Sequence, residues 1–416
     1  MKLENNLEEL DMNFNEWRKI ELGELVDSIS IKHKFDKNQL IFLNTSDVLE
    51  GKVLHQNYLD INTLPGQAKK SIKKGDILFS EIRPKNKRFA LVDFDADDYI
   101  VSTKLMVLRR KNSLIDNLFL YKYLTSDRIL EELQFIAEGR SGTFPQITFN
   151  ELKSLKISLP PLNEQKAIAD ILSSLDDKIE LNNQMNETLE EMAQALFKRW
   201  FVDFEFPNEE GQPYKSSGGE MVESELGMIP KGWNFKNLSD IVDNFDSKRI
   251  PLSKREREKR QKIYPYYGAA SIADFVDDFI FEGRYILMGE DGTVIDNNGY
   301  PILQYVWGKF WVNNHAHVLQ GKNYYSNEFV YLKLKSTNVQ ALVTGAVQPK
   351  INQKNMNSIK TVVAPKEIHI KFNQLMENIY SKYRLNFEQN ESLKQLRDSL
   401  LPKLMSGEIR VSDLKS

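Results

Sequence analysis

The feature that most constrains this chain is an internal duplication. Residues 17–27 and 233–243 share a Trp, a Leu five positions later and a final Val-Asp, 216 residues apart. Residues 181–189 and 385–393 share Leu-Asn, Asn-Glu and a final Leu, 204 residues apart. A repeated sequence period marks a repeated structural unit. The sequence therefore predicts two copies of a globular segment followed by a long segment, with a net 12 residues of insertion or linker inside the first copy.

Both long segments have the hydrophobic period of a coiled coil. Their seam residues alternate four and three positions apart, a mean spacing of 3.5 that keeps one stripe facing a partner helix. The seam positions are Ile168, Leu172, Leu175, Ile179, Asn182, Asn186, Leu189, Ala193, Leu196 and Trp200 in the first copy, and Phe372, Met376, Ile379, Tyr383, Asn386, Asn390, Leu393, Arg397, Leu400 and Leu404 in the second. Proline stands just before each segment, where a helix is expected to begin.

Each seam carries two consecutive Asn positions at its centre. These are Asn182 and Asn186 in the first copy, and Asn386 and Asn390 in the second. A buried polar pair costs stability but fixes register and orientation, so we expect these four residues to set the register of the helix pair. Both an antiparallel and a parallel pairing would align them. The alternative is that they are surface residues on a helix bend.

The globular segments have a different pattern. Short β-like runs at 76–80, 104–108, 285–288 and 316–319 are separated by turn residues. The predicted fold class is therefore α/β (mixed α+β), with two tandem domains each followed by a long helix.

Composition limits the class of protein. The 416 residues are 41% hydrophobic and 28% charged, with a net charge of −3, which excludes global disorder. Cysteine is absent, so disulfides, thiolate metal sites and cysteine nucleophiles are excluded. Residues 1–20 lack the apolar run of a signal peptide, and no stretch has the length of a membrane span. We expect a soluble, cytoplasmic protein with no membrane partner.

Catalytic motifs are missing from the sequence. It has no Walker phosphate loop, no G-x-G-x-x-G, no H-E-x-x-H, no G-x-S-x-G and no Asn/Asp-Pro-Pro-Tyr tetrapeptide typical of amino-methyltransferases. We therefore expect no catalytic residues in this chain.

Two short motifs suggest a metal site only weakly. His315 and His317 fit one strand face and would bind zinc with a remote carboxylate, but base readout or a hydrogen-bonded core pair is favoured. Residues 289–296 offer carboxylates, but a polar turn between strands is favoured there. The sequence therefore predicts no metal site.

Basic clusters occur in both copies and favour DNA binding. Residues 248–262 hold eight Lys or Arg against two Glu, and such patches attract phosphates. The alternative is a solvated helical face with i,i+4 ion pairs. Gly-rich loops at 139–143 and 344–350 occupy matching places near the end of each domain.

Arg and Lys suit guanine edges and Asn suits adenine edges, while other basic groups contact phosphates. The candidate DNA-binding residues are Lys69, Lys70, Arg83, Lys85, Lys87, Arg88, Arg140 and Thr143 in the first copy, and Lys248, Arg249, Lys254, Arg255, Arg257, Lys259, Arg260, Asn313, Asn314, His315 and Lys350 in the second.

Several motifs together resemble a known family. The runs at 159–172, 175–182, 196–201, 225–233 and 400–409 are similar to the conserved regions of type I restriction–modification specificity (S) subunits, in the expected order and with the expected duplication. The second copy departs from the Pro-Pro-x-x-Glu-Gln motif and has Pro-Lys-Glu-Ile-His-Ile instead, while its heptads persist.

The resemblance implies two target-recognition domains that each read half of a split double-stranded DNA target. It implies that the long helices form an antiparallel coiled coil with pseudo-twofold symmetry, which sets the unread spacer. The chain itself would be non-catalytic and bind no cofactor. It would recruit two adenine-N6 methyltransferase (modification) subunits that bind S-adenosylmethionine, and ATP- and Mg-dependent restriction/translocase subunits.

The expected organisation follows the duplication. It consists of an N-terminal tail (1–14), target-recognition domain 1 (15–161), a central conserved helix (162–206), a linker (207–228), target-recognition domain 2 (229–365), a C-terminal conserved helix (366–406) and a C-terminal tail (407–416).

Three alternatives remain at this point. The chain could be an enzyme that cuts or modifies DNA itself, which the missing motifs oppose. It could be a coiled-coil scaffold without a DNA role, which the paired basic clusters oppose. Trp200 and Phe201, at the end of the first helix, fit a methyltransferase-docking surface and a seam-end core equally well.

Overall fold

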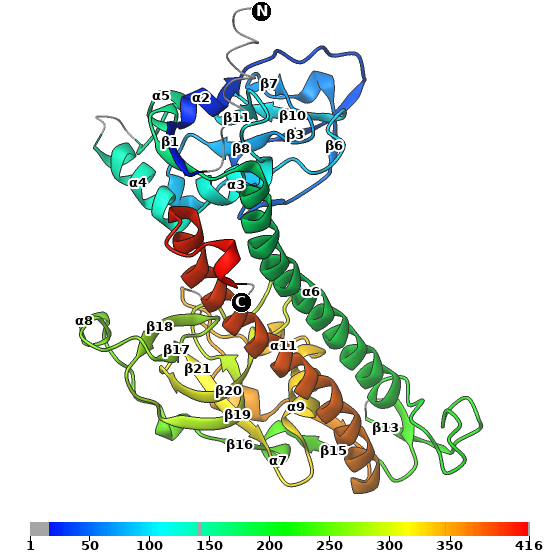
Figure 1. Ribbon diagram of the computed structural model, residues 1–416. Coiled ribbons are helices and arrows are strands. Elements are labelled where there is room, and N and C mark those ends of the chain that lie inside the picture. The colour runs from blue at the N-terminus through cyan, green and yellow to red at the C-terminus, as the bar shows by residue number, and fades with distance from the viewer. Residues whose placement is uncertain (1–15, 140–143, 226, 346, 415–416) are drawn as a thin grey trace, which may run out of the picture. The chain divides into compact units, whose positions relative to one another are not determined.

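The computed structural model describes residues 16–139, 144–225, 227–345 and 347–414 (Figure 1). Their contacts divide the chain into two compact units. The first comprises the described residues up to Leu181 and from Gln389 onward, and the second comprises Asn182–Glu388. Each unit therefore contains one globular domain and one half of each long helix.

The domain of the first unit is built on two four-stranded sheets, with strand orders β6-β3-β10-β7 and β2-β11-β8-β9. Their strands are β2 (Val26–Ile29), β3 (Gln39–Leu43), β6 (Tyr58–Asp60), β7 (Ala68–Ser71), β8 (Ile77–Ser80), β9 (Phe89–Leu91), β10 (Tyr99–Ser102) and β11 (Leu105–Arg110). The short hairpin β4 (Val48–Leu49)–β5 (Lys52–Val53) and the helices α2 (Leu22–Leu25), α3 (Asn117–Leu124), α4 (Asp127–Glu138) and α5 (Phe149–Lys153) complete it.

Strand β11 explains the apolar run at 104–108. Met106 and Leu108 join one buried cluster, while Leu105 and Val107 join another. A strand buried on both faces reads as a continuous apolar run instead of an alternating one.

The domain of the second unit has one six-stranded sheet of order β16-β21-β19-β20-β17-β18. Its strands are β16 (Val242–Asn244), β17 (Tyr264–Tyr267), β18 (Ile272–Val276), β19 (Phe281–Gly289), β20 (Leu303–Val312) and β21 (Ala316–Gly321). The helices around it are α7 (Leu238–Ile241), α8 (Lys254–Glu258), α9 (Asn327–Lys335) and α10 (Gln353–Asn357).

A two-stranded ladder closes each domain in the same way. In the first, β1 (Arg18–Glu21) pairs antiparallel with β12 (Lys156–Leu159). In the second, β15 (Asn234–Asn237) pairs antiparallel with β22 (Lys360–Val363). Each ladder joins the start of a domain to the strand that leads into its long helix, so the duplication predicted from the sequence is confirmed.

The four predicted β-like runs are confirmed as parts of β8, β11, β19 and β21. The segment expected to be a linker, 207–228, has structure of its own. It contains the hairpin β13 (Met221–Ser224)–β14 (Gly227–Pro230), and Tyr214 stacks on Phe206 with ring centroids 4.6 Å apart. Phe206 in turn packs against Trp233.

The two long helices, α6 (Leu162–Phe201) and α11 (Lys366–Ser406), run antiparallel within each unit (Figure 1). In the first unit, Arg397 Nη1 lies 2.7 Å from Asp176 Oδ1, and farther along α6 the Ile179 carbonyl accepts from the earlier Asn390. In the second unit, the Asn386 amide donates to Asn186 Oδ1 at 2.9 Å. The predicted antiparallel pairing is therefore confirmed.

None of the described helices has the length and apolar character to cross a membrane.

Three of the four seam asparagines are buried, which excludes the helix-bend alternative for those three. Asn182 and Asn386 are fully buried, Asn390 is 3% exposed, and Asn186 is half-buried. An amide buried among apolar side chains favours the register in which it finds a partner. Their control of register remains a prediction.

The Glu-Gln motif at the start of α6 fastens the helix to its domain. Buried Gln165 accepts from the Asp116 N–H and donates to the carbonyls of Leu114 and Pro160, all at 2.8 Å. Its amide thus satisfies three backbone groups at the helix start.

The second copy replaces this glutamine by His369, in the same place relative to the ladder and the helix. The ring is fully buried, and Nε2 accepts from the Ala364 N–H at 3.3 Å. Phe329 and Tyr325 pack on it with centroids 4.5 and 4.8 Å away. Burial lowers the pKa of His369 from 6.5 to about 4, because the apolar surroundings disfavour the charged ring.

This histidine predicts a loss of stability in mild acid. The folded-state pKa lies below the unfolded value, so the unfolded chain takes up the proton first as the pH falls. The free energy of unfolding is therefore unaffected by this group above pH 6.5. It declines as the pH falls towards 4, by about 3 kcal/mol in total. His369→Phe keeps an aromatic ring and removes the titration. Urea unfolding should show a shallower decline for the variant over this range, and equal declines would contradict the prediction.

Candidate nucleic-acid interface

The basic run 248–262 divides into residues that hold the fold and residues that face solvent. Arg257 donates to Asp274 at 3.1 Å and lies over the Tyr266 ring, and Arg260 donates to Asp277 at 2.9 Å. The Lys262 ammonium, together with Arg257 and the Phe275 N–H, lowers the pKa of Asp274 to about 2. These arginines fasten α8 to β18.

Five other basic residues of the run are exposed: Lys248, Lys254, Arg255, Lys259 and Lys262. Lys254 has a distant i,i+4 contact with Glu258 at 3.9 Å, and Lys248 lies over the Phe245 ring. Among the described residues, the side chains of Arg255 and Lys259 have no hydrogen-bond or ion-pair partner. Ser253 caps α8 through Glu256, so the short helix presents its basic side chains from a fixed backbone.

Four basic residues of the first domain follow β8 in the chain: Arg83, Lys85, Lys87 and Arg88. Arg83 and Lys87 have left-handed backbone conformations (φ 46° and 54°) on either side of the 3-10 turn Pro84–Asn86. Such strain in residues other than glycine concentrates at functional sites. Arg83 is exposed and lies 5.6 Å from the centroid of the exposed Phe144 ring.

The remaining candidates of this domain differ in their availability. Lys69 is exposed, Lys85 faces Glu131 at 3.6 Å, and Lys87 faces Asp127 at 3.2 Å. Arg88 donates to the carbonyls of Ser46 and Val48, which commits its guanidinium to the fold. Arg140 and Thr143 lie outside the described residues.

Lys70 lies inside the protein and is only 9% exposed. Its ammonium donates to the carbonyls of Thr103 and Leu105 at 2.9 and 2.8 Å. Burial lowers the pKa of Lys70. We leave Lys70 and Arg88 out of the proposed DNA contacts for this reason.

In the second domain, the structure brings several predicted residues together at the turn between β20 and β21. Asn314 and His315 are exposed at its tip, while Asn313 is buried beneath them and accepts from the His315 N–H at 2.8 Å. The Lys350 ammonium lies 3.1 Å from Glu290 beside the turn, and the Glu290 N–H donates to the His315 carbonyl.

Arg249 lies beneath this turn. Its guanidinium donates to the Ala316 carbonyl at 2.7 Å and to Glu290 at 2.6 Å. Its side chain is 12% exposed, so Arg249 supports the turn and is also left out of the proposed DNA contacts.

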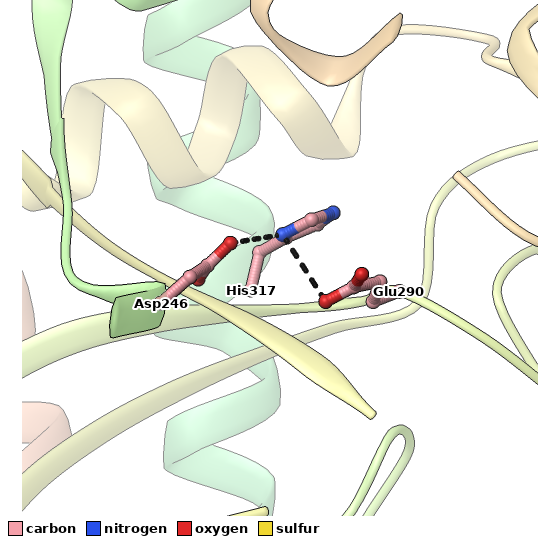
Figure 2. Close-up of side chains that lie close together, drawn as sticks. All are labelled: Asp246, Glu290 and His317. Carbon is pink, nitrogen blue, oxygen red and sulfur yellow. Dashed lines mark hydrogen bonds and ion pairs between the residues drawn. The ribbon is translucent and has the colours of Figure 1, made fainter. Parts of the chain in front are cut away.

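One residue from each weak metal motif, His317 and Glu290, lies beside Asp246 in a charge cluster (Figure 2). His317 Nδ1 lies 2.6 Å from Asp246 Oδ2 and 3.6 Å from Glu290 Oε2. Nε2 lies 2.8 Å from the Ile351 carbonyl, and since a carbonyl only accepts, this nitrogen donates to it and Nδ1 is the ring nitrogen that faces the carboxylates.

Arg249 also contacts both carboxylates of this cluster. Burial raises the pKa of Asp246, but hydrogen bonds from His317 and the Val318 N–H outweigh it and bring the value below its ordinary range. Burial also raises the pKa of Glu290, and there Arg249 with His317 outweighs it and lowers the value. His317, Asp246 and Glu290 thus form one hydrogen-bonded, charged cluster in which the exposed His315 takes no part. The absence of a metal site remains a prediction.

Trp200 and Phe201 are 5% and 6% exposed and belong to the core that joins α6 to the second domain. Their packing against Phe372 matches the seam-end core and not the docking surface. Lys104, in the turn between β10 and β11, and Gln146, which shares Glu81 with it, were not among the residues predicted from the sequence. Gln146 stands 204 residues before Lys350, so the repeat offset was the signal that would have found it.

Comparisons with known proteins assign the family. The model of the type I restriction modification DNA specificity domain matches residues 15–191 and 230–395, one match for each copy. The chain is 32% identical to the HindI specificity subunit of Haemophilus influenzae, over 95% of this chain and 100% of that protein. It is 30% identical to the MjaIX specificity subunit of Methanocaldococcus jannaschii, over 71% and 70% of the two chains.

A solved structure shows the same fold. It is the S subunit of a type I restriction–modification system from M. genitalium, with a TM-score of 0.57, 19% identity, and coverage of 95% of this chain and 97% of that one. The duplicated domains, the two long helices and the match to both copies lead to one conclusion: this chain belongs to the type I restriction–modification DNA specificity family.

Proposed function

We propose that this chain is the sequence-specific DNA-recognition subunit of a type I restriction–modification complex. Each globular domain reads one half of a bipartite double-stranded target, and α6 with α11 sets the number of base pairs left unread between them. The observation that carries this proposal is the family match to both copies. It is supported by the exposed basic and amide side chains in each domain.

The chain directs chemistry that partner subunits perform. The proposed partners are two adenine-N6 methyltransferase subunits, which use S-adenosylmethionine, and restriction/translocase subunits, which use ATP and Mg²⁺. We assign 15–161 and 229–365 as the target-recognition domains, and we place the complex in the cytoplasm, where genomic DNA is available.

The geometry separates two kinds of DNA contact. Exposed cations on fixed backbone suit phosphates, which position a protein without specifying sequence. In the second domain we assign this role to Lys254, Arg255 and Lys259, and in the first to Lys69, Arg83 and Lys85. Each phosphate that a cation neutralises releases counterions, so such contacts make binding dependent on salt.

The phosphate assignment predicts a change in that salt dependence. Replacing Lys254, Arg255 and Lys259 with Ala should weaken binding of the partnered complex to all duplexes alike. It should also reduce the slope of log affinity against log salt, by about one for each phosphate that is no longer neutralised. Fluorescence anisotropy at several salt concentrations measures both. A matched variant, Lys254→Arg with Lys259→Arg, keeps the charge and should keep the slope. An unchanged slope in the alanine variant would remove α8 from the interface.

The proposed role of the helix pair predicts that longer helices give a longer spacer. Inserting four residues after Asn183 and four after Phe387 lengthens both helices by about 6 Å, or about two base pairs of DNA. A map of N6-methyladenine in cells that carry only this variant should show the same half-sites with a longer spacer. Four residues inserted at Gly211, in an exposed turn outside the helices, should leave the spacer as it was. An unaltered spacer in the helix variant would contradict the ruler.

A further inference from the structure

The turn described above in the second domain has a counterpart in the first, between β10 and β11. There Thr103 and Lys104 take the places of Asn314 and His315. The Lys104 N–H donates to the Ser102 hydroxyl oxygen at 3.2 Å, as the His315 N–H donates to the buried Asn313 amide oxygen at 2.8 Å.

The backbone around the two turns matches bond for bond. The N–H of Glu81 donates to the Lys104 carbonyl at 3.2 Å, and the N–H of Glu290 donates to the His315 carbonyl at 2.8 Å. The Ile147 N–H then donates to the Glu81 carbonyl at 2.9 Å, and the Ile351 N–H donates to the Glu290 carbonyl at the same distance.

A cation with little exposed surface binds backbone carbonyls of each turn. In the first domain, Lys70 binds the carbonyls on either side of Lys104. In the second, Arg249 binds the carbonyl of Ala316 at 2.7 Å and approaches that of Asn314 at 3.5 Å. The two cations do not share a position in the repeat, since Lys70 lies on β7 and Arg249 follows β16. The same support has been built from two different parts of the chain.

A half-buried carboxylate also contacts the polar residue beside each turn. Gln146 donates to Glu81 at 3.0 Å, and Lys350 lies 3.1 Å from Glu290. The carboxylate side chains are 19% and 13% exposed, whereas the Lys104 and His315 side chains are 48% and 46% exposed. The scaffold is therefore covered, and the tip of the turn faces outward.

We propose that these two turns are the base-reading elements of the two domains. Thr103, Lys104 and Gln146 read one half-site, and Asn314, His315 and Lys350 read the other. The backbone that presents them is the same, while their hydrogen-bonding chemistry differs, as two unlike half-sites require. Lys reads guanine edges and Asn reads adenine edges in the major groove. This inference rests on the proposed function and names the residues that set specificity; Lys70 and Arg249 are positioning residues.

The test substitutes one tip residue in each domain of the full-length chain, partnered with its methyltransferase subunits. With Lys104→Ala, a methylation map should gain related sites that differ at one position of one half-site. With Asn314→Ala, it should gain sites that differ in the other half-site. Misfolding loses methylation and cannot create new sites. Lys19→Ala, on β1 and outside both turns, is the matched surface control and should keep the original motif.

Binding by the purified complexes supplies the second measurement. For each tip variant, the ratio of affinities for the cognate duplex and single-base variants should fall by about 10- to 100-fold at one position. If the original motif and this ratio both persist, the turns do not read bases, although the proposed function stands. If both variants lose discrimination in the same half-site, the assignment of one turn to each half-site is wrong, and the proposed function still stands. If the unaltered complex shows no sequence preference at all, the proposed function itself fails.

Discussion

The antiparallel packing of α6 against α11 is the constraint on which the rest of the structure depends. The first unit needs residues from both ends of the chain, because Leu404 and Met405 of α11 pack in the same core as Ile168 and Leu172 of α6. The second unit is closed in the same manner by Phe372 against Trp200. Neither unit is therefore complete until both helices have paired. The proposed control of spacer length requires this property. A domain that folded without the helix pair would leave the distance between the two half-sites undetermined.

The two domains hold corresponding turns with different residues. In each, a largely buried cation donates hydrogen bonds to backbone carbonyls of the outward-facing turn that we propose to read bases. A carbonyl pair without such a donor would be costly to bury. Lys70 and Arg249 meet this need from unrelated positions, which indicates that the supported turn matters more than the residue that supports it.

Much of the fold could be predicted from the sequence, because periodicity and repeated motifs are visible in neighbouring residues. A 3.5-residue period predicted both helices, and the shared motifs predicted the duplication. The roles of individual cations could not be predicted, because burial depends on neighbours far apart in sequence. In the sequence, nothing distinguishes Arg257 and Arg260 from Arg255. In the structure, Arg257 pairs with Asp274 and Arg260 pairs with Asp277, whereas the Arg255 side chain faces solvent. Lys70 looked like Lys69, yet the alternation of β7 turns one inward and the other outward. His315 and His317 formed one motif, but only His317 enters the buried cluster.

The central claim is that this chain chooses which DNA sequence its partners act upon. A genome-wide map of N6-methyladenine, made in the native cell with and without this gene, tests it most directly. We expect deletion to remove methylation from one split motif, whose two halves are the sites read by the two domains, and the full-length gene to restore it. Methylation that is unchanged by deletion would contradict the claim.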